Sequence, residues 1–281
     1  MKTFGVIGAG QMGAGIAQVA ASSGLSVLLI DAKREFADKA KAHIASALAK
    51  QVDKGKLPRA EMDATMERIV ASNDLGALAQ ADFVVEAAPE SQGLKESIFT
   101  QIDAIVPPSA VLASNTSSIS ITALAARTKR PTQVIGMHFM NPVPAMKLVE
   151  IIRGLQTSDS AYDTTKLLAE RLGKATVLAK EAPGFIVNRI LIPMLNEAIF
   201  VLENGLASQE DIDQAMKLGT NQPMGPLQLA DLIGLDTVLA ICECLHGELG
   251  DDKYRPAPLL RRYVAAGWLG RKAGQGFYKY G

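Results

Sequence analysis

The 281-residue sequence has few cysteines, few aromatic residues and no excess of either charge. Its two cysteines, Cys242 and Cys244, lie two positions apart, and on a helix they would point in different directions and would not bridge readily. Neither has enough neighbouring ligands to indicate a metal site, so we expect no metal. Free thiols of this kind are typical of a reducing compartment, and we expect a cytoplasmic protein.

Excess charge and long apolar runs are also missing. The 29 basic and 29 acidic residues give a formal net charge of zero, which argues against nucleic acid as the main partner. No apolar run reaches the roughly 18 residues that a membrane helix needs. The first predicted strand starts by Thr3, so we expect no leader peptide. Since 48% of the residues are hydrophobic, a large core is available, and the length favours about two domains.

Residues 1–183 alternate apolar strands with helical segments, which predicts an α/β domain with a mostly parallel sheet covered on both faces. A charged stretch at about residues 34–69 has apolar residues at helical spacing and is broken at residues 55–58. It predicts a helical hairpin inserted into this domain. Strands are expected at residues 4–7, 26–30, 69–72, 83–87, 111–114, 134–137, 148–152 and 175–178.

After residue 183 the apolar periodicity is helical, so residues 184–281 are expected to form a smaller all-α domain. Helices are expected at residues 186–203, 208–218, 227–245 and 258–265, and Ser208 with Asp211 three positions later is typical of a helix start. Several apolar side chains of the first helix suit either a core or a dimer surface, and the core is favoured: Ile190, Met194, Leu195, Ile199 and Leu202.

A glycine motif directly after the first strand is the strongest functional signal. Gly8-x-Gly10-x-x-Gly13 joins that strand to a helix, and Asp31 ends the second strand 18 residues after Gly13. In the dinucleotide-binding fingerprint, the first glycine permits a tight turn, the second lets the backbone approach a pyrophosphate, and the third lets helix and sheet pack closely. A glycine turn without a ligand is the alternative, but Asp31 favours a bound dinucleotide.

Asp31 also bears on which dinucleotide binds. Its carboxylate can accept hydrogen bonds from the adenosine ribose and would repel a 2′-phosphate, which favours NAD. Lys33 and Arg34 follow closely and could neutralise such a phosphate, so NADP stays open.

One of the three histidines follows a predicted strand at the edge where ligands collect in open α/β sheets. Twelve residues after His138, Glu150 lies within an apolar strand, where a carboxylate is costly to bury without a partner. An imidazole would be such a partner, and it suits proton transfer near neutral pH when hydride leaves an alcohol carbon. The residues alone weigh this pair evenly against a structural histidine and an edge glutamate.

A third cluster, Ser114-Asn115-Thr116-Ser117-Ser118, follows another apolar strand. Small hydroxyl and amide side chains at a strand end can cap a helix or bind a ligand oxygen, and taken alone the cap is favoured.

Together these motifs resemble the L-3-hydroxyacyl-CoA dehydrogenase family, and within it the stand-alone short-chain (3-hydroxybutyryl-CoA) branch. The resemblance covers essentially the whole chain. It is carried by GAGQMG (8–13), SNTSS (114–118), HFMNPVP (138–144), KLVE (147–150), EAPGFIVNR (181–189), PMGPL (223–227) and GQGFY (274–278).

The resemblance implies that His138 is the catalytic acid/base and Glu150 its orienting partner. Ser117 and Asn188 would bind the reacting oxygen or the thioester carbonyl, in a cleft between the domains, and Asn141 would help to shape the site. The residues expected at the cofactor are Gly8, Gly10, Gln11, Met12, Gly13, Asp31, Glu90, Lys95 and Asn115.

The same resemblance implies a role for the helical hairpin in substrate binding, because in relatives the hairpin closes over coenzyme A. Lys50 and Lys54 match the positions that reach the ribose phosphate, with Lys56 and Arg59 beyond them, although a solvated charged face is the alternative. Met140 departs from the family, where many members carry a second aromatic residue.

We therefore expect an oxidoreductase that interconverts a short-chain 3-oxoacyl-CoA, such as acetoacetyl-CoA, and the L-3-hydroxyacyl-CoA. The resemblance also implies a homodimer. The nearest rival is an NAD-dependent dehydrogenase of a sugar acid, similar to gulonate dehydrogenases, which would keep the His–Glu pair without coenzyme A contacts. A redox sensor without turnover is a rival of another class, disfavoured by the presence of His138, Glu150, Ser117 and Asn188 together.

Overall fold

The computed structural model describes residues 1–281, which divide into two compact units, Met1–Glu181 and Ala182–Gly281. None of the helices combines the length and the apolar character needed to span a membrane.

The first unit is built on one eight-stranded sheet with the order β3-β2-β1-β4-β5-β6-β7-β8. All neighbouring strands are parallel except β6 and β7, so the predicted, mostly parallel α/β sheet is confirmed. The strands are β1 (Thr3–Ile7), β2 (Ser26–Ile30), β3 (Ile69–Ser72), β4 (Phe83–Glu86), β5 (Val111–Ser114), β6 (Val134–Phe139), β7 (Leu148–Arg153) and β8 (Ala175–Lys180).

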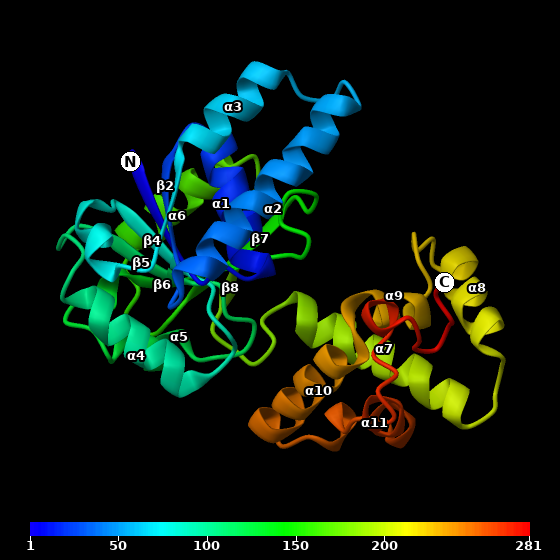
Figure 1. The fold of residues 1–281 in the computed structure, drawn as a ribbon. Helices are drawn as coiled ribbons and strands as arrows, with labels where there is room; N and C mark the ends of the chain where they lie inside the picture. The colour runs from blue at the N-terminus through cyan, green and yellow to red at the C-terminus, as the bar shows by residue number, and fades with distance from the viewer. The chain divides into compact units, whose positions relative to one another are not determined.

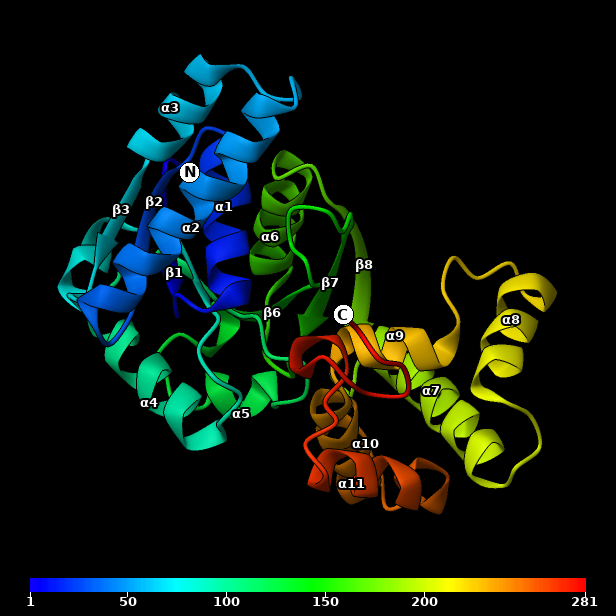
Figure 2. The ribbon, with the colours of Figure 1, turned by 45° about the vertical axis from the view of Figure 1, so that its right-hand side comes forward.

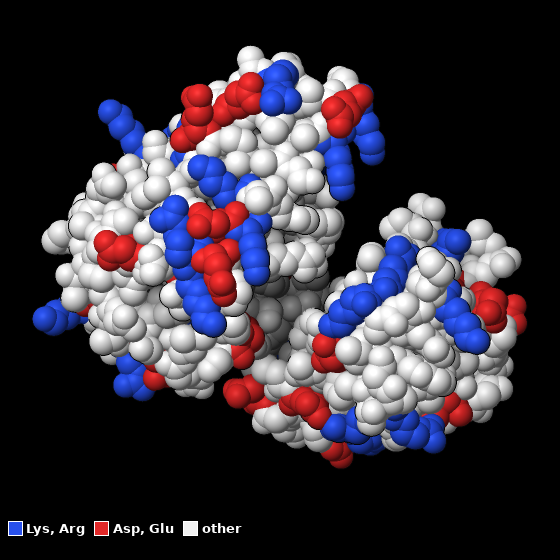
Figure 3. All heavy atoms as spheres, in the orientation of Figure 1, with Lys and Arg blue, Asp and Glu red and all other residues white.

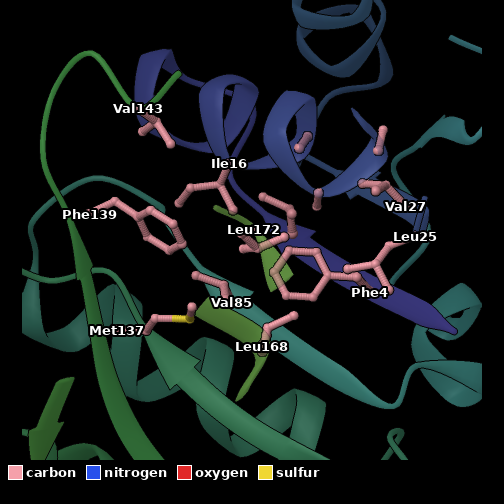
Figure 4. Close-up of a cluster of buried hydrophobic side chains, with 14 of the residues drawn as sticks. Phe4, Ile16, Leu25, Val27, Val85, Met137, Phe139, Val143, Leu168 and Leu172 are labelled. Atoms are coloured by element: carbon pink, nitrogen blue, oxygen red, sulfur yellow. The ribbon is translucent and has the colours of Figure 1, made fainter. Parts of the chain in front are cut away.

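Helices cover both faces of this sheet (Figures 1 and 2). They are α1 (Gln11–Ser22), α2 (Arg34–Asp53), α3 (Arg59–Glu67), α4 (Gln92–Asp103), α5 (Ile121–Ala125) and α6 (Asp159–Arg171). The apolar sides of α1, α2 and α6 pack on one face, and Figure 4 shows Ile16 of α1 and Leu168 of α6 among side chains of that face. On the opposite face α5 lies so close to β6 that a Cβ on Gly136 would be 3.1 Å from Ile121 Cδ1.

Strand β6 is two residues longer than predicted and includes His138. It extends because His138 and Phe139 pair with Glu150 and Val149 of β7. Met137 and Phe139 point into the core beneath α1 (Figure 4), and side chains alternate along a strand. His138 therefore belongs to the other face, the one that α5 covers.

The predicted helical hairpin is confirmed as α2 and α3, with a turn at residues 54–58 in which Gly55 has φ +67°. Ala40, Ile44 and Leu48 of α2 and Met62 of α3 are buried against the rest of the unit. This apolar stripe anchors the hairpin, and its charged residues stay at the surface.

The second unit is helical, as predicted. Its helices are α7 (Val187–Glu203), α8 (Gln209–Gly219), α9 (Pro226–Ile233), α10 (Leu235–Leu249) and α11 (Pro258–Ala265). Leu195 and Ile199 lie in its core, Met194 and Leu202 pack against that core, and Ile190 is 69% exposed. Ser208 caps α8 by accepting a hydrogen bond from Asp211 N at 3.2 Å, which confirms the predicted helix start.

The single helix predicted over residues 227–245 is wrong. The chain turns at Gly234, which has φ +102° and separates α9 from α10. An L-residue would be strained in that conformation, so the glycine permits the corner. Apolar periodicity continues on both sides of the corner because both helices contribute to the same core, which hid the break.

Two buried aspartates hold the end of the chain in this unit. Asp231 of α9 accepts hydrogen bonds from Phe277 N, Tyr278 N and Tyr280 Oη at 2.9–3.0 Å. Asp213 of α8 accepts from Leu227 N, Gln228 N and Tyr278 Oη. The terminal segment is thus fastened by side chains of α8 and α9 rather than by a strand.

Candidate active site

The glycine turn after β1 has the shape that a pyrophosphate requires. A Cβ on Gly8, whose φ is +97°, would lie 2.6 Å from the Ala87 carbonyl oxygen, and one on Gly13 would lie 1.7 Å from that of Gly8. At Gly10 a Cβ would meet nothing within 4 Å. No side chain caps α1, so the first-turn amides, which include those of Gln11 and Met12, point toward this open position.

Asp31 lies beside this turn at the end of β2. Its Oδ2 accepts a hydrogen bond from Ala9 N at 2.7 Å, and its Oδ1 lies 3.5 Å from Lys33 N. The turn, the uncapped helix and the carboxylate therefore fit the pyrophosphate and ribose of a dinucleotide. The half-buried Asp31 keeps further lone pairs for ribose hydroxyls.

His138 and Glu150 are brought together across β6 and β7. They are partners in the antiparallel register, and His138 Nδ1 lies 2.7 Å from Glu150 Oε2. Glu150 is fully buried, and His138 is 7% exposed. Because an ionised carboxylate only accepts hydrogen bonds, this contact assigns the hydrogen to Nδ1 and leaves Nε2 as the proton-accepting nitrogen.

The cluster after β5 faces a carboxylate and does not cap a helix. Helix α5 is capped by Ser120, which accepts from Ala123 N at 3.0 Å, so the interpretation of the cluster as a cap is wrong. The hydroxyls of Thr116, Ser117 and Ser118 donate instead to Glu90 Oε1, at 2.6, 3.2 and 3.0 Å.

Asn115 connects two strand ends at the same edge. Its backbone N–H donates to the Glu86 carbonyl at 2.7 Å, and its side-chain Oδ1 accepts from Phe139 N at 2.9 Å. It therefore fixes the end of β5 relative to the residue that follows His138.

Lys95 of α4 is only 1% exposed, and its ammonium points inward. It donates to Glu86 Oε1 at 2.6 Å and to the Ala88 carbonyl at 3.0 Å, and it lies 3.4 Å from Glu90 Oε2. Any effect of Lys95 on a cofactor therefore passes through these neighbours. Glu86, which sequence reasoning missed, is fully buried and also accepts from Ser114 Oγ and Ala88 N at 2.6 Å.

The Glu90 carboxyl is held in its ionised form. Burial alone would raise its pKa, but the Lys95 charge and the hydrogen bonds from Thr116, Ser117 and Ser118 together hold that pKa below its usual value. Its side chain is 38% exposed, so the charge is presented toward solvent at the site's edge.

Lysines of the hairpin gather at its tip. Lys50, Lys54 and Lys56 line one hollow together with His43, Ser46, Ala47 and Gln51. Figure 3 shows basic side chains at this end of α2. The hollow is thus lined by several lysine side chains, and the contact of Lys50 and Lys54 with a coenzyme A phosphate stays a prediction.

The remaining predicted residues lie elsewhere in the fold. Asn141 is exposed in the loop from β6 to β7, close in sequence to His138. Asn188 is half-buried in the first turn of α7, in the second unit. No group of three or more His, Cys, Asp or Glu side chains is arranged to hold a metal ion.

Sequence reasoning also missed Lys174, which supports the β6–β7 loop. Its ammonium is buried and donates to the carbonyls of Val143 and Met146 at 2.6 and 2.7 Å. Burial lowers the pKa of this lysine, because the interior disfavours its charged form. Nothing in the local sequence distinguishes it from the surface lysines around it.

A dinucleotide cradle and a buried His–Glu pair on one sheet define a class, the nicotinamide-dependent dehydrogenases. Within that class, the family model "3-hydroxyacyl-CoA dehydrogenase, NAD binding domain" matches residues 3–182, and that of the family's C-terminal domain matches residues 184–280. The chain belongs to the 3-hydroxyacyl-CoA dehydrogenase family.

Individual relatives match this chain over nearly its full length. The chain is 58% identical over 277 residues to the "Probable 3-hydroxybutyryl-CoA dehydrogenase" of Deinococcus radiodurans, covering 99% of both chains. It is 52% identical over 280 residues to the 3-hydroxybutyryl-CoA dehydrogenase of Bradyrhizobium diazoefficiens, covering 100% of this chain and 96% of the relative. The crystal structure of (S)-3-hydroxybutyryl-CoA dehydrogenase PaaH1 from Ralstonia eutropha matches with a TM-score of 0.96 and 53% identity, covering 100% of this chain and 99% of that one.

Proposed function

We propose that this protein interconverts acetoacetyl-CoA, or another short-chain 3-oxoacyl-CoA, and the corresponding L-3-hydroxyacyl-CoA. The observation that carries the proposal is the 2.7 Å contact between His138 and the buried Glu150, at the sheet edge that also holds the glycine cradle. The names of relatives at 52–58% identity support this substrate class over a sugar acid.

His138 moves the proton of the reaction. In oxidation its Nε2 accepts the proton of the C3 hydroxyl, and the Glu150 carboxylate stabilises the resulting imidazolium through Nδ1. In reduction the imidazolium returns that proton to the C3 oxygen. The bound nicotinamide supplies or accepts the hydride.

Three further side chains are proposed to hold the substrate. Ser117 donates to Glu90 at a long 3.2 Å, so its hydroxyl can turn toward a substrate oxygen at low cost. Asn141 would shape the pocket after β6, and Asn188 of the second unit would bind a carbonyl oxygen of the thioester, as the family resemblance implies.

We propose NAD as the cofactor in preference to NADP. Arg34 pairs with Asp38 at 3.0 Å, and Lys33 lies over the Phe36 ring, so both cations have partners besides a 2′-phosphate. The Asp31 charge opposes that phosphate directly. Asp31→Asn keeps an acceptor for Ala9 N–H and removes the charge, so kcat/KM for NADPH relative to NADH should rise. An unchanged ratio would contradict the role of Asp31.

We also propose that a second copy of the chain is the partner of the helical unit. Leu206, Leu218 and Ile190 are 77%, 76% and 69% exposed there, although all three are large apolar side chains.

The proposed reaction is tested by NADH oxidation with acetoacetyl-CoA and with free acetoacetate, and by NAD⁺ reduction with a gulonate-type sugar acid. Turnover that requires the thioester supports the proposal. Turnover of either free acid at a kcat/KM equal to or greater than that of the thioester would contradict the proposal and favour a dehydrogenase of free hydroxy acids.

A further inference from the structure

Two carboxylates share one ammonium at the carboxyl edge of β4 and β5. Lys95 Nζ lies 2.6 Å from Glu86 Oε1 and 3.4 Å from Glu90 Oε2. Glu86 and Lys95 are 0% and 1% exposed as side chains, whereas Glu90 is 38% exposed. The shorter, buried contact assigns the lysine charge to Glu86, so the group retains about one negative charge, carried by Glu90.

The loops around this charge are held firmly. Glu90 Oε1 also accepts from the backbone N–H groups of Ser117 and Ser118 at 2.9 and 3.1 Å. Glu86 accepts from Ala88 N and Ser114 Oγ, so it fixes the loop that leads to Glu90. A charge in a preorganised setting acts at full strength because little has to move when a ligand's charge changes.

The strand order indicates which half of a dinucleotide meets this charge. Strand β1 lies at the switch point between β2 and β4, and the glycine turn follows it. In such folds the adenosine lies on the half that contains β2, beside Asp31, so the nicotinamide lies over the half formed by β4, β5 and β6. Besides Glu86 and Lys95, whose charges cancel, Glu90 and the Glu150–His138 pair are charged groups at the carboxyl edge of that half.

We propose that the Glu86–Lys95–Glu90 group shifts the relative affinity of the site toward the oxidised nicotinamide, compared with the same site without the Glu90 charge. Oxidised and reduced cofactors share the same phosphates and differ by the positive charge of the ring. The surplus negative charge of Glu90 therefore stabilises NAD⁺ more than NADH and favours release of hydride from bound NADH. In this arrangement Glu86 is a positioning residue that neutralises Lys95 and so leaves Glu90 charged. The inference rests on the proposed nicotinamide chemistry.

The test is the ratio of two dissociation constants, measured by fluorescence or calorimetry without acyl-CoA. In Glu90→Gln the hydroxyls of Thr116 and Ser118 keep an acceptor, but the charge is gone. We expect the ratio Kd(NAD⁺)/Kd(NADH) to rise on the order of tenfold, the size of a unit charge acting across a partly exposed site. Equal changes in both constants, or no change in their ratio, would overturn the proposal.

Matched variants separate charge from shape. Glu90→Asp keeps the charge, so its ratio should stay near that of the original protein even if both constants increase. Glu96→Gln makes the same chemical change one position after Lys95, on a side chain that pairs with Arg127, and should leave the ratio unchanged. A shift of the ratio in either variant that equals the shift in Glu90→Gln would refute the charge argument.

Salt provides a measurement on the unaltered protein. Because the phosphates are common to both cofactor forms, the ratio isolates the ring charge, and it should rise as the ionic strength is raised from about 0.01 to 1 M and Glu90 is screened. A ratio that does not depend on salt would overturn the inference even if Glu90→Gln fails to fold. None of these readouts needs turnover, so they stand apart from the acetoacetyl-CoA test.

Discussion

The proton transfer that we propose for His138 would depend on Glu150, which is 12 residues away in sequence and lies opposite His138 on the neighbouring strand. Replacing His138 with Asn should lower kcat by roughly 10²- to 10⁴-fold, the usual contribution of general acid/base catalysis. Glu150→Gln should also lower kcat, since it keeps the shape and removes the charge that stabilises the imidazolium. Steady-state kinetics with acetoacetyl-CoA and NADH would measure both effects.

NADH affinity is the control for these two variants, because neither residue lies in the glycine cradle. We expect the dissociation constant of NADH and the melting temperature of His138→Asn to stay close to those of the original protein. Near-normal kcat in a folded His138→Asn protein would rule out His138 as the acid/base.

From the residues alone, the cost of burying Glu150 left its pairing with His138 evenly weighed against a structural histidine, and only the family resemblance favoured the pair. Sequence reasoning could not foresee the direction of Lys95. A lysine in the first turn of a helix is usually solvated, and its partner Glu86 lies nine positions earlier on a strand. The orientation follows from tertiary packing, in which the buried carboxylate needs a cation.

At the scale of elements, the hairpin presents Lys50 in the last turn of α2 and Lys54 at the C-cap of the same helix, and both line one hollow. We expect Lys50→Ala and Lys54→Ala each to raise the KM for acetoacetyl-CoA about two- to fivefold, the size of an exposed ion pair, with little change in kcat. Inhibition by free coenzyme A should weaken in parallel. Lys39→Ala, an exposed change on the same helix, is the control. Unchanged KM in both lysine variants would mean that the hairpin tip does not meet the substrate.

The C-terminal segment that contains Phe277, Tyr278 and Tyr280 is held in place by Asp231. A Cβ on Gly276 would lie 2.0 Å from Asp231 Oδ1, so the segment fits only as glycine at that point. Burial and the Asp231 hydrogen bond raise the pKa of Tyr280 to about 12, and its hydroxyl therefore keeps its proton and donates.

Asp231→Ala would leave the N–H groups of Phe277 and Tyr278 and the Tyr280 hydroxyl without their acceptor. We expect a loss of about 3 kcal/mol or more in the free energy of unfolding, from buried donors left unsatisfied. Tyr280→Phe removes only one of these bonds and should cost about 1 kcal/mol. Urea titration followed by far-UV circular dichroism measures both, and equal effects would contradict the shared role of Asp231.

Elements were predicted better than the corners between them. All eight strands were found because each is a short apolar run. The corner at Gly234 was missed because one glycine within a helical pattern is often tolerated, and only the packing of α9 and α10 shows that it turns the chain.

For the whole molecule, the dimer proposal predicts a mass in light scattering of twice the 29.8 kDa chain at micromolar concentration. Leu218→Asp should shift that mass toward the monomer, since it would bury a charge in the interface. Leu155→Asp, on a residue that is 86% exposed in the first unit, should leave the mass unchanged. A monomer in the unaltered protein would contradict the proposal.

The hydrogen bond from Ala9 N to Asp31 bears on any redesign of the proposed cofactor preference from NAD toward NADP. Asp31, which we propose contacts the ribose, also supports the glycine turn that we propose binds the pyrophosphate. A substitution of Asp31 is therefore expected to change cofactor selectivity and cofactor affinity together. A variant with a small apolar residue at position 31 would no longer repel the 2′-phosphate. It would also leave the Ala9 N–H without its acceptor and so weaken the binding of every dinucleotide. A successful redesign has to give the Ala9 amide a new acceptor.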